Sequence, residues 1–189
     1  MIETLIKKIA RNLDKENIPY MIIGGQAVLV YGRPRLTRDI DITLGVDTDK
    51  FKLIEQICKN LKLRCPVTNP EEFTQTTKVF PVEEPESKIR ADFIFSFTPY
   101  EAQALKRTKQ IDIDNYKVKF ASCEDVIIHK MVAGRAIDEE DIKSILTKNG
   151  KTIDLDYIRK WLLEFAKIEE YSNILDRFST LLKKQLTQE

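Results

Sequence analysis

The segment "IIGGQAVLVYGRPRLTRDIDITL", residues 22–44, predicts two strands joined by a glycine turn and a short helix. The apolar run YMII ends at Gly24-Gly25, where the chain is free to turn sharply. Residues 26–32 then have the composition of a short helix that ends at a glycine. Residues 39–45 alternate acidic and apolar side chains, which is the pattern of a strand with one buried face.

Two aspartates, Asp39 and Asp41, occupy positions of the second strand that share one face. The pair is a weak signal by itself, because three other aspartate pairs with this spacing occur in the chain. Those pairs are Asp47/Asp49, Asp112/Asp114 and Asp154/Asp156. The first of these pairs is explained by a helix cap, the second by a turn and the third by the start of a helix. None of the three follows a glycine turn. The glycine turn therefore distinguishes the first pair.

A third carboxylate is expected on a later strand. Residues 88–97, "KIRADFIFSF", alternate in a way that predicts a strand with Asp92 on its polar side. An acid on the solvated side of a strand is the ordinary alternative. Three carboxylates are suited to hold Mg²⁺, or Mn²⁺, and the amino end of a helix favours phosphate. Together these parts predict metal-assisted nucleotidyl transfer, in which one carboxylate helps to deprotonate an acceptor hydroxyl.

Composition limits the class of protein. The chain has 189 residues, 42% hydrophobic and 32% charged, which suits one ordinary domain with a helical extension. We expect no membrane span, no signal peptide and a cytoplasmic location. Lysine and arginine nearly balance aspartate and glutamate, 31 against 30, so only a local patch is available for nucleic acid. Three scattered cysteines and one histidine argue against disulfides and structural zinc.

The order of the expected elements predicts an α+β fold, with a small mixed β-sheet flanked by helices and a C-terminal helical part. The α/β part is expected over residues 1–121 and the helical part over residues 122–189. Residues 65–88 contain four prolines and are expected to be irregular, apart from an edge strand within residues 77–83.

Two segments resemble a known group of proteins. Residues 22–44 are similar to the signature of the nucleotidyltransferase superfamily: a glycine turn, a short helix and an aspartate pair on the next strand. The arrangement most resembles the branch that contains the AbiEii-type toxins of type IV toxin–antitoxin systems. Residues 122–142, "SCEDVIIHKMVAGRAIDEEDI", resemble a downstream block of that branch, in which a lysine, an arginine and an acidic pair follow one another. The resemblance implies the minimal nucleotidyltransferase fold, Mg²⁺ and a nucleoside triphosphate.

The resemblance also implies a role for each residue of the predicted site. Asp39 and Asp41 would hold the metal, while Asp92 would bind one metal and act as base or orient the acceptor. Lys130 would neutralise the triphosphate as a point charge. The implied nucleotide-binding set is Gly24, Gly25, Arg38, Lys130 and Arg135.

Some of these residues have ordinary structural explanations. Lys130 could be an exposed helical lysine. Asp138 and Asp141 could simply be acidic residues that the helix dipole favours in the first turn of a helix. Alternatively, one of them could orient Lys130 or Arg135. His129, beside Lys130, is expected to be structural.

Three arginines lie between the glycine turn and the aspartate pair. Arg33 and Arg35 are expected to be solvated, with nucleotide or acceptor contact as the alternative. Arg38 precedes Asp39 directly and by alternation points with Ile40, yet it can reach a phosphate at the start of the strand.

Two classes of function fit these predictions. One is an enzyme that transfers a nucleotidyl group to RNA, protein or a small molecule, either as a toxin-like enzyme controlled by an antitoxin or as a modifier of an antibiotic-like compound. The alternative is a non-catalytic nucleotide-binding or interaction module that retains the fold. The acceptor, the preferred base and the oligomeric state are open at this point.

Overall fold

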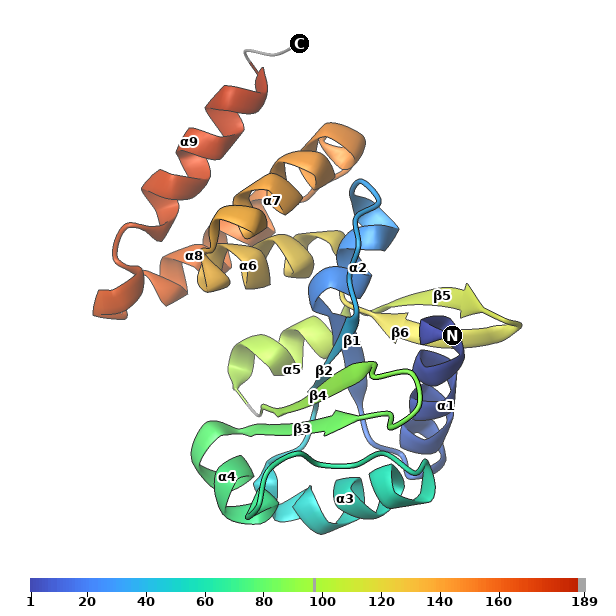
Figure 1. Ribbon diagram of the computed structural model, residues 1–189. Coiled ribbons are helices and arrows are strands. Elements are labelled where there is room, and N and C mark those ends of the chain that lie inside the picture. Colours follow the sequence, from blue (N-terminus) through green and yellow to red (C-terminus); the bar gives the residue numbers. More distant parts are fainter. Residues whose placement is uncertain (97, 187–189) are drawn as a thin grey trace. The chain divides into compact units, whose positions relative to one another are not determined.

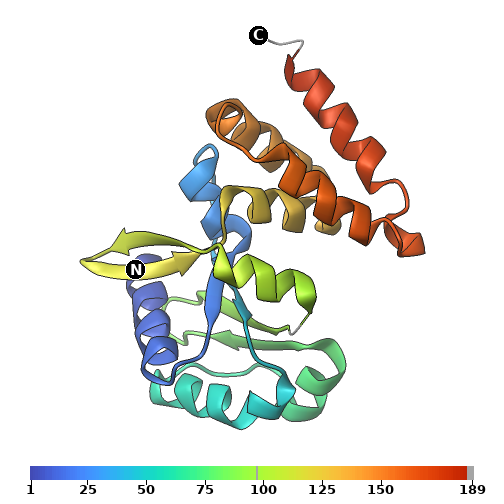
Figure 2. The same ribbon diagram turned by 180° about the vertical axis from the view of Figure 1, so that it is seen from behind.

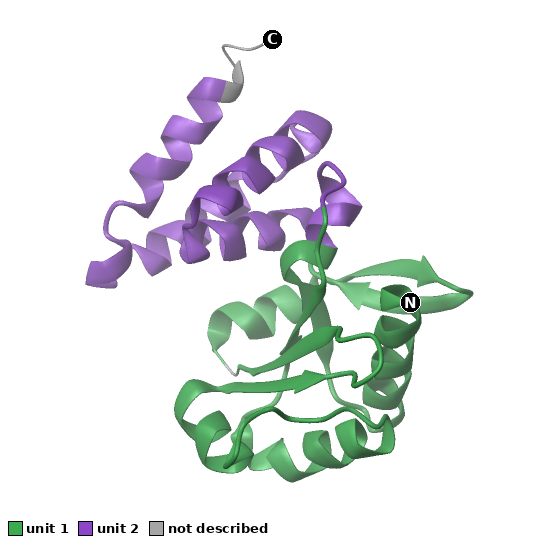
Figure 3. Cartoon of the chain, in the orientation of Figure 1, with its two compact units in different colours: residues 1–26, 36–121 green, residues 27–35, 122–189 purple. Residues whose placement is uncertain are grey.

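The computed structural model describes residues 1–96 and 98–186; Phe97, the last residue of the predicted strand 88–97, lies outside them. The chain forms two compact units, here called the core unit and the helical unit (Figure 3). The core unit contains Met1–Gln26 and Leu36–Ala121, and the helical unit contains Ala27–Arg35 and Ser122–Glu189. The division into domains after residue 121 stays a prediction.

The core unit is built on one six-stranded mixed β-sheet (Figure 1). Its strands are β1 (Tyr20–Ile23), β2 (Asp39–Leu44), β3 (Val79–Glu83), β4 (Arg90–Phe95), β5 (Lys109–Ile113) and β6 (Tyr116–Phe120). The spatial order is β3-β4-β2-β1-β6-β5. The pairs β2–β4 and β1–β6 are parallel, and the other neighbours are antiparallel. The predicted α+β fold with a small mixed sheet is confirmed.

Helices accompany the sheet. They are α1 (Ile2–Lys15), α3 (Phe51–Asn60) with the 3₁₀ turn η1 (Thr48–Lys50) before it, α4 (Pro70–Thr77) and α5 (Pro99–Lys106). Contacts join α1 to β5, β6 and α3, and Figures 1 and 2 show the hairpin of β5 and β6 beside α1. The turn of this hairpin lies at Asp114-Asn115, in keeping with the turn expected for the pair Asp112/Asp114, and both residues have a positive φ.

Alternation of apolar residues explains the two central strands. On β2, Ile40 and Ile42 are fully buried, and on β4 the same is true of Phe93. Burying each such side chain contributes about 1.5–3 kcal/mol, so the apolar face holds the strands against the core. The intervening residues of the two strands are therefore left on the opposite face.

The expectation that residues 65–88 are irregular is wrong in part, because α4 forms within them. Pro70 is the first residue of α4, where the missing N–H costs nothing and the fixed φ suits a helix. The same arrangement starts α5 at Pro99, with Thr98 as its N-cap. The edge strand predicted near Pro81 is confirmed, since β3 lies at the end of the sheet.

The helical unit comprises most of α2 (Gly24–Tyr31) together with α6 (Cys123–Ala133), α7 (Ala136–Asn149), α8 (Leu155–Phe165), the 3₁₀ turn η2 (Glu169–Tyr171) and α9 (Ile174–Leu186). Ser122 caps α6 by accepting a hydrogen bond from the Asp125 amide. Gly134 ends α6 with a φ of +64°, which suits glycine. Within the described part of the chain, no helix is long and apolar enough to cross a membrane. The cytoplasmic location stays a prediction.

Candidate active site

The glycine turn after β1 lies directly against the aspartate pair of β2. Gly24 has a φ of +62°, a conformation that other residues rarely adopt. A Cβ at this position would lie 2.7 Å from the Cγ of Asp41 and would clash with its Oδ2. Ile23, the residue before the turn, pairs with Asp41 in the antiparallel register. Only glycine therefore lets the chain turn this close to the carboxylate.

The third predicted carboxylate lies on the neighbouring strand in register with the pair. Asp41 is the partner of Asp92 across the parallel strands β2 and β4, and Asp39 is the partner of Arg90. Partners across a ladder point to the same side of a sheet, and so do residues two apart on one strand. Asp39, Asp41 and Asp92 consequently share one face, here called the carboxylate face.

The electrostatics of this face are visible in the pKa of Asp92. Asp92 is half-buried, and burial raises its pKa above the ordinary value. The negative charge of Asp41 raises it further, whereas the guanidinium of Arg90 acts in the opposite direction. Burial and the charge of Asp41 therefore outweigh the guanidinium of Arg90 in setting the pKa of Asp92.

Asp39 has a cationic partner within the same face. Its Oδ1 accepts from Nε of Arg90 at 2.9 Å and lies 2.8 Å from Nη2 of the same guanidinium. Both side chains are accessible, 44% for Asp39 and 65% for Arg90. The alternation of β4 places Arg90 on the same side as Asp92. The sequence pattern therefore could have predicted Arg90 on this face, although the residue was not singled out.

The chemistry of the carboxylate face fits a hard divalent cation. Carboxylate oxygens are the preferred ligands of Mg²⁺, and a cation would relieve the repulsion between Asp41 and Asp92. Among residues 1–96 and 98–186, no three potential ligand side chains converge closely enough to hold a metal ion as they lie. The ion pair of Asp39 with Arg90 occupies one of the three carboxylates in this arrangement.

The remaining predicted residues of the core unit surround the pair. Gly25 is buried in the first turn of α2, where backbone N–H groups of a helix start lie. Gln26, which the sequence did not single out, donates from Nε2 to the Asp39 carbonyl at 3.3 Å. Arg38 is exposed immediately before Asp39. The start of α2 is thus attached to the strand that carries the carboxylates.

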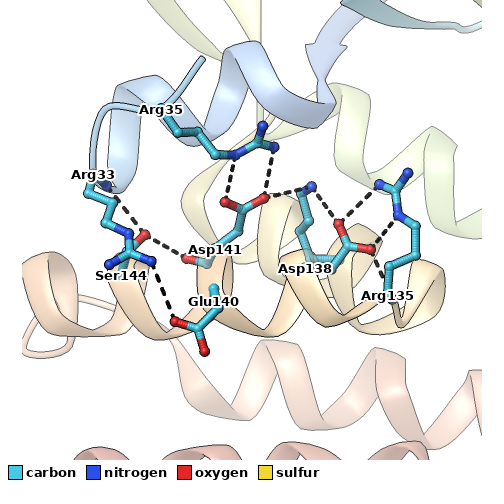
Figure 4. A network of polar contacts seen from close by, with 8 residues as sticks. Arg33, Arg35, Arg135, Asp138, Glu140, Asp141 and Ser144 are labelled. Carbon is cyan, nitrogen blue, oxygen red and sulfur yellow. Dashed lines mark hydrogen bonds and ion pairs between the residues drawn. The ribbon is translucent and has the colours of Figure 1, made fainter. Parts of the chain in front are cut away.

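Lys130, the predicted triphosphate ligand, lies in the interior of the helical unit. Its Nζ donates to Oδ1 of Asp138 at 2.6 Å and lies 2.9 Å from Oδ2 of Asp141, and its side chain is only 5% exposed. It is therefore not the exposed lysine of the ordinary explanation. Figure 4 shows both aspartates on one helix, with their carboxylates directed at cations.

Two arginines complete this group, here called the buried ion network: Lys130, Asp138, Asp141, Arg35 and Arg135. Arg35 donates two parallel hydrogen bonds to Asp141, at 2.8 and 3.0 Å (Figure 4). The side chain and backbone N–H of Arg135 bond to Asp138 at the start of α7. Burial raises the pKa of Asp138, but hydrogen bonds from Arg135 and Lys130 outweigh it, so the pKa lies below its usual range.

The two loop arginines differ from each other. Arg33 is 64% exposed and makes a 3.4 Å ion pair with Glu140, in keeping with a solvated charge. The expectation for Arg35 is wrong, because its side chain is 26% exposed and is held by the buried Asp141. The partner lies 106 residues further along the chain, so no local pattern announces it.

The mixed sheet with its flanking helices is a fold shared with solved structures of nucleotidyltransferase-like proteins. The solution structure of the antibiotic-resistance factor ANT(2'')-Ia is similar, with a TM-score of 0.58 and 18% identity over 98% of this chain and 95% of that one. An antigenic nucleotidyltransferase-like protein from Paracoccidioides brasiliensis gives 0.56 and 20% over 92% and 91%. Lincomycin-bound lincosamide antibiotic adenylyltransferase LnuA gives 0.50 and 17% over 70% and 89%. These likenesses establish the fold.

The chain belongs to the family described as "Nucleotidyltransferase of unknown function (DUF6036)", whose model matches residues 1–181. No curated protein sequence matches it. Membership of the superfamily, inferred from residues 22–44, is confirmed. The resemblance to the AbiEii-type branch stays a prediction.

Proposed function

We propose that this protein is a metal-dependent nucleotidyltransferase whose active site is the carboxylate face of the core unit. The observation that carries the proposal is the register of Asp41 with Asp92, together with the approach of Gly24 to the Asp41 carboxylate. A face with three carboxylates, on which the ion pair of Asp39 with Arg90 is exposed, is suited to receive a positively charged ligand.

The residues of the face divide the reaction between them. Mg²⁺ or Mn²⁺ held by Asp39, Asp41 and Asp92 would offset the charge that develops on the phosphates. The acceptor oxygen bonds to the α-phosphorus, the bond from that phosphorus to the bridging oxygen breaks, and pyrophosphate leaves. Asp92 takes the proton of the acceptor hydroxyl.

The nucleotide is bound by the start of α2 and by a cation of the core unit. The amides at Gly25 and Gln26 belong to the first turn of α2, whose free N–H groups and dipole favour phosphate. Arg38 supplies a further positive charge. Arg135 lies in the helical unit, and its role as a nucleotide ligand stays a prediction from the resemblance.

Lys130 is reassigned in this proposal. A phosphate contact would require Lys130 to leave Asp138 and Asp141, both of which are buried. We therefore assign Lys130 to the stability of the helical unit, and its role as a triphosphate ligand becomes the alternative.

The acceptor is a hydroxyl compound of one of three kinds: a small molecule, an RNA or a protein. A small-molecule acceptor is supported by the fold that this chain shares with two proteins described as an antibiotic-resistance factor and an antibiotic adenylyltransferase. A toxin-like role with an antitoxin partner is supported by the resemblance of residues 122–142 to the AbiEii-type branch.

The test is transfer of label from the four α-³²P-labelled ribonucleoside triphosphates in the presence of Mg²⁺. Purified protein is incubated with total RNA, with cell-lysate protein and with a panel of hydroxylated antibiotics. We expect label in one pool, its loss in Asp41→Asn and its retention in Asp49→Asn, which alters an exposed aspartate of a look-alike pair. Binding of a nucleotide without transfer to any pool would favour the non-catalytic alternative.

A further inference from the structure

Arg90 occupies a position on the carboxylate face where a structural arginine would contribute little. Its guanidinium meets Oδ1 of Asp39 through both Nε, at 2.9 Å, and Nη2, at 2.8 Å. Both side chains are more than one-third exposed, and exposed ion pairs typically contribute 0 to about 1 kcal/mol. This ion pair can therefore be broken at small cost to the fold.

The guanidinium and a divalent cation would compete for the same oxygen. A metal bound to Asp39 uses the lone pairs of its carboxylate, and a guanidinium carries only donors and a positive charge. Two cations at one Oδ1 repel each other, so each weakens the binding of the other to Asp39. A metal that binds Oδ1 of Asp39 therefore competes with the Arg90 guanidinium and favours its release.

The released side chain has a clear second partner. Arg90 and Asp92 are two residues apart on β4, so their Cβ atoms point to the same side of the sheet. The guanidinium is a planar fork that binds phosphate oxygens in a bidentate manner. A triphosphate that arrives with the metal on this face brings those oxygens to the displaced arginine.

We propose that Arg90 is a placeholder cation: it neutralises Asp39 in the empty protein, gives way to the metal, and then contacts the phosphates of the bound nucleotide. The proposal rests on the proposed function of the carboxylate face. It assigns to one residue two effects of opposite sign, a weakening of metal binding without nucleotide and a strengthening of nucleotide binding.

The test measures both effects in the full chain. Mn²⁺ binding without nucleotide is followed by electron paramagnetic resonance, and binding of a non-hydrolysable ATP analogue with Mg²⁺ is followed by calorimetry. For Arg90→Gln we expect about fivefold tighter Mn²⁺ binding, from loss of the competing ion pair. We expect about tenfold weaker binding of the analogue, from loss of the phosphate contact. Arg90→Lys, which keeps the charge and loses the fork, should lie between.

Lys88→Gln is the matched control, because Lys88 is a 70% exposed cation two residues before Arg90 that pairs with Glu83. Both constants should be unchanged in this variant. Equal Mn²⁺ affinities in Arg90→Gln and the wild type, or equal shifts in Arg90→Gln and Lys88→Gln, would overturn the placeholder role. If Asp41→Asn still abolishes Mn²⁺ binding in that case, the proposed function survives. Absence of Mn²⁺ binding in both the wild type and Arg90→Gln would overturn both.

Discussion

The carboxylate face and the buried ion network use the same kinds of side chain with opposite results. The carboxylate face carries three acids, and the one ion pair shown for it, between Asp39 and Arg90, is exposed. The buried ion network carries two acids and three cations, and its aspartates are at most 3% exposed. In the network each carboxylate is bonded to two cationic side chains.

The difference separates a site that needs a ligand from one that is already complete. Buried charges are tolerated when hydrogen bonds and opposite charges satisfy them, and their removal then destabilises the protein. Accessible carboxylates that repel one another contribute no such stability, but they bind cations readily. We therefore expect substitutions in the carboxylate face to affect activity and substitutions in the buried ion network to affect folding.

Asp41→Asn should break the carboxylate face most completely. Loss of a metal ligand should lower label transfer by about a thousandfold or more. The free energy of unfolding, measured with urea, should stay equal or rise, because one of the like charges beside Asp92 is removed. Asp49→Asn should change neither quantity. If Asp41→Asn lowered the free energy of unfolding as well as label transfer, Asp41 would be a residue that supports the fold.

Lys130→Met should show the reverse behaviour. Removing the ammonium leaves Asp138 and Asp141 buried with one cationic side chain each, which should cost about 3–5 kcal/mol of the free energy of unfolding. The control is Lys167→Met, which removes a 66% exposed lysine paired with Glu164 and should cost less than about 0.5 kcal/mol. A small loss of stability combined with much weaker nucleotide binding would restore Lys130 as a triphosphate ligand.

The helical unit should also respond to acid through His129. Burial, with a smaller contribution from the charge of Lys130, lowers the pKa of His129 from 6.5 to about 4. The unfolded chain therefore binds this proton more tightly than the folded protein does. The contribution of neutral His129 to the free energy of unfolding is fully present above pH 6.5 and is lost as the pH falls toward 4. The expected loss is about 2 kcal/mol at about pH 5. Urea unfolding of His129→Phe should lack this part of the slope, and parallel slopes would refute the assignment.

Arg35→Lys should have a moderate effect. A lysine cannot reproduce the two parallel hydrogen bonds to Asp141, and we expect a loss of about 1–2 kcal/mol in the free energy of unfolding. Arg33→Lys is the matched control two residues away, because Arg33 is 64% exposed and should change stability by less than about 0.5 kcal/mol. Equal effects of the two substitutions would show that Arg35 is solvated, as its sequence context suggested.

Asp92→Asn should give the smallest change in stability, with a pH dependence opposite to that of His129. The raised pKa of Asp92 means that the folded protein binds this proton more tightly than the unfolded chain. The ionised carboxylate therefore destabilises the fold at neutral pH, and Asp92→Asn should be slightly more stable there. The advantage should shrink as pH falls through the raised pKa and vanish below 3.8. A lower free energy of unfolding for Asp92→Asn than for the wild type at neutral pH would contradict this prediction.

Local patterns explain why much of the core unit was predictable. Alternation identified β2 and β4 because one face of each strand is buried, and Gly24 identified the turn because its positive φ admits few other residues. The helices α4 and α5 were missed, since prolines that begin a helix resemble prolines that end one.

Long-range pairing explains what was missed in the sites. The register of Asp41 with Asp92 joins residues 51 positions apart, so the sequence indicated the third carboxylate only by its strand pattern. The burial of Lys130 depends on α7 packing against α6, which brings two acids to it. A single lysine in a helical sequence carries no sign of that packing, and Lys130 was therefore interpreted as exposed or ligand-binding.

The location of a bound metal distinguishes the two regions most directly. Crystals grown with Mn²⁺ and a non-hydrolysable ATP analogue would show the ion by its anomalous scattering. We expect the peak on the carboxylate face, about 2.1 Å from oxygens of Asp41 and Asp92, with Arg90 turned away from Asp39. A peak at Asp138 and Asp141, or a nucleotide bound with its phosphates on Lys130 and no metal at Asp41, would contradict the central claim.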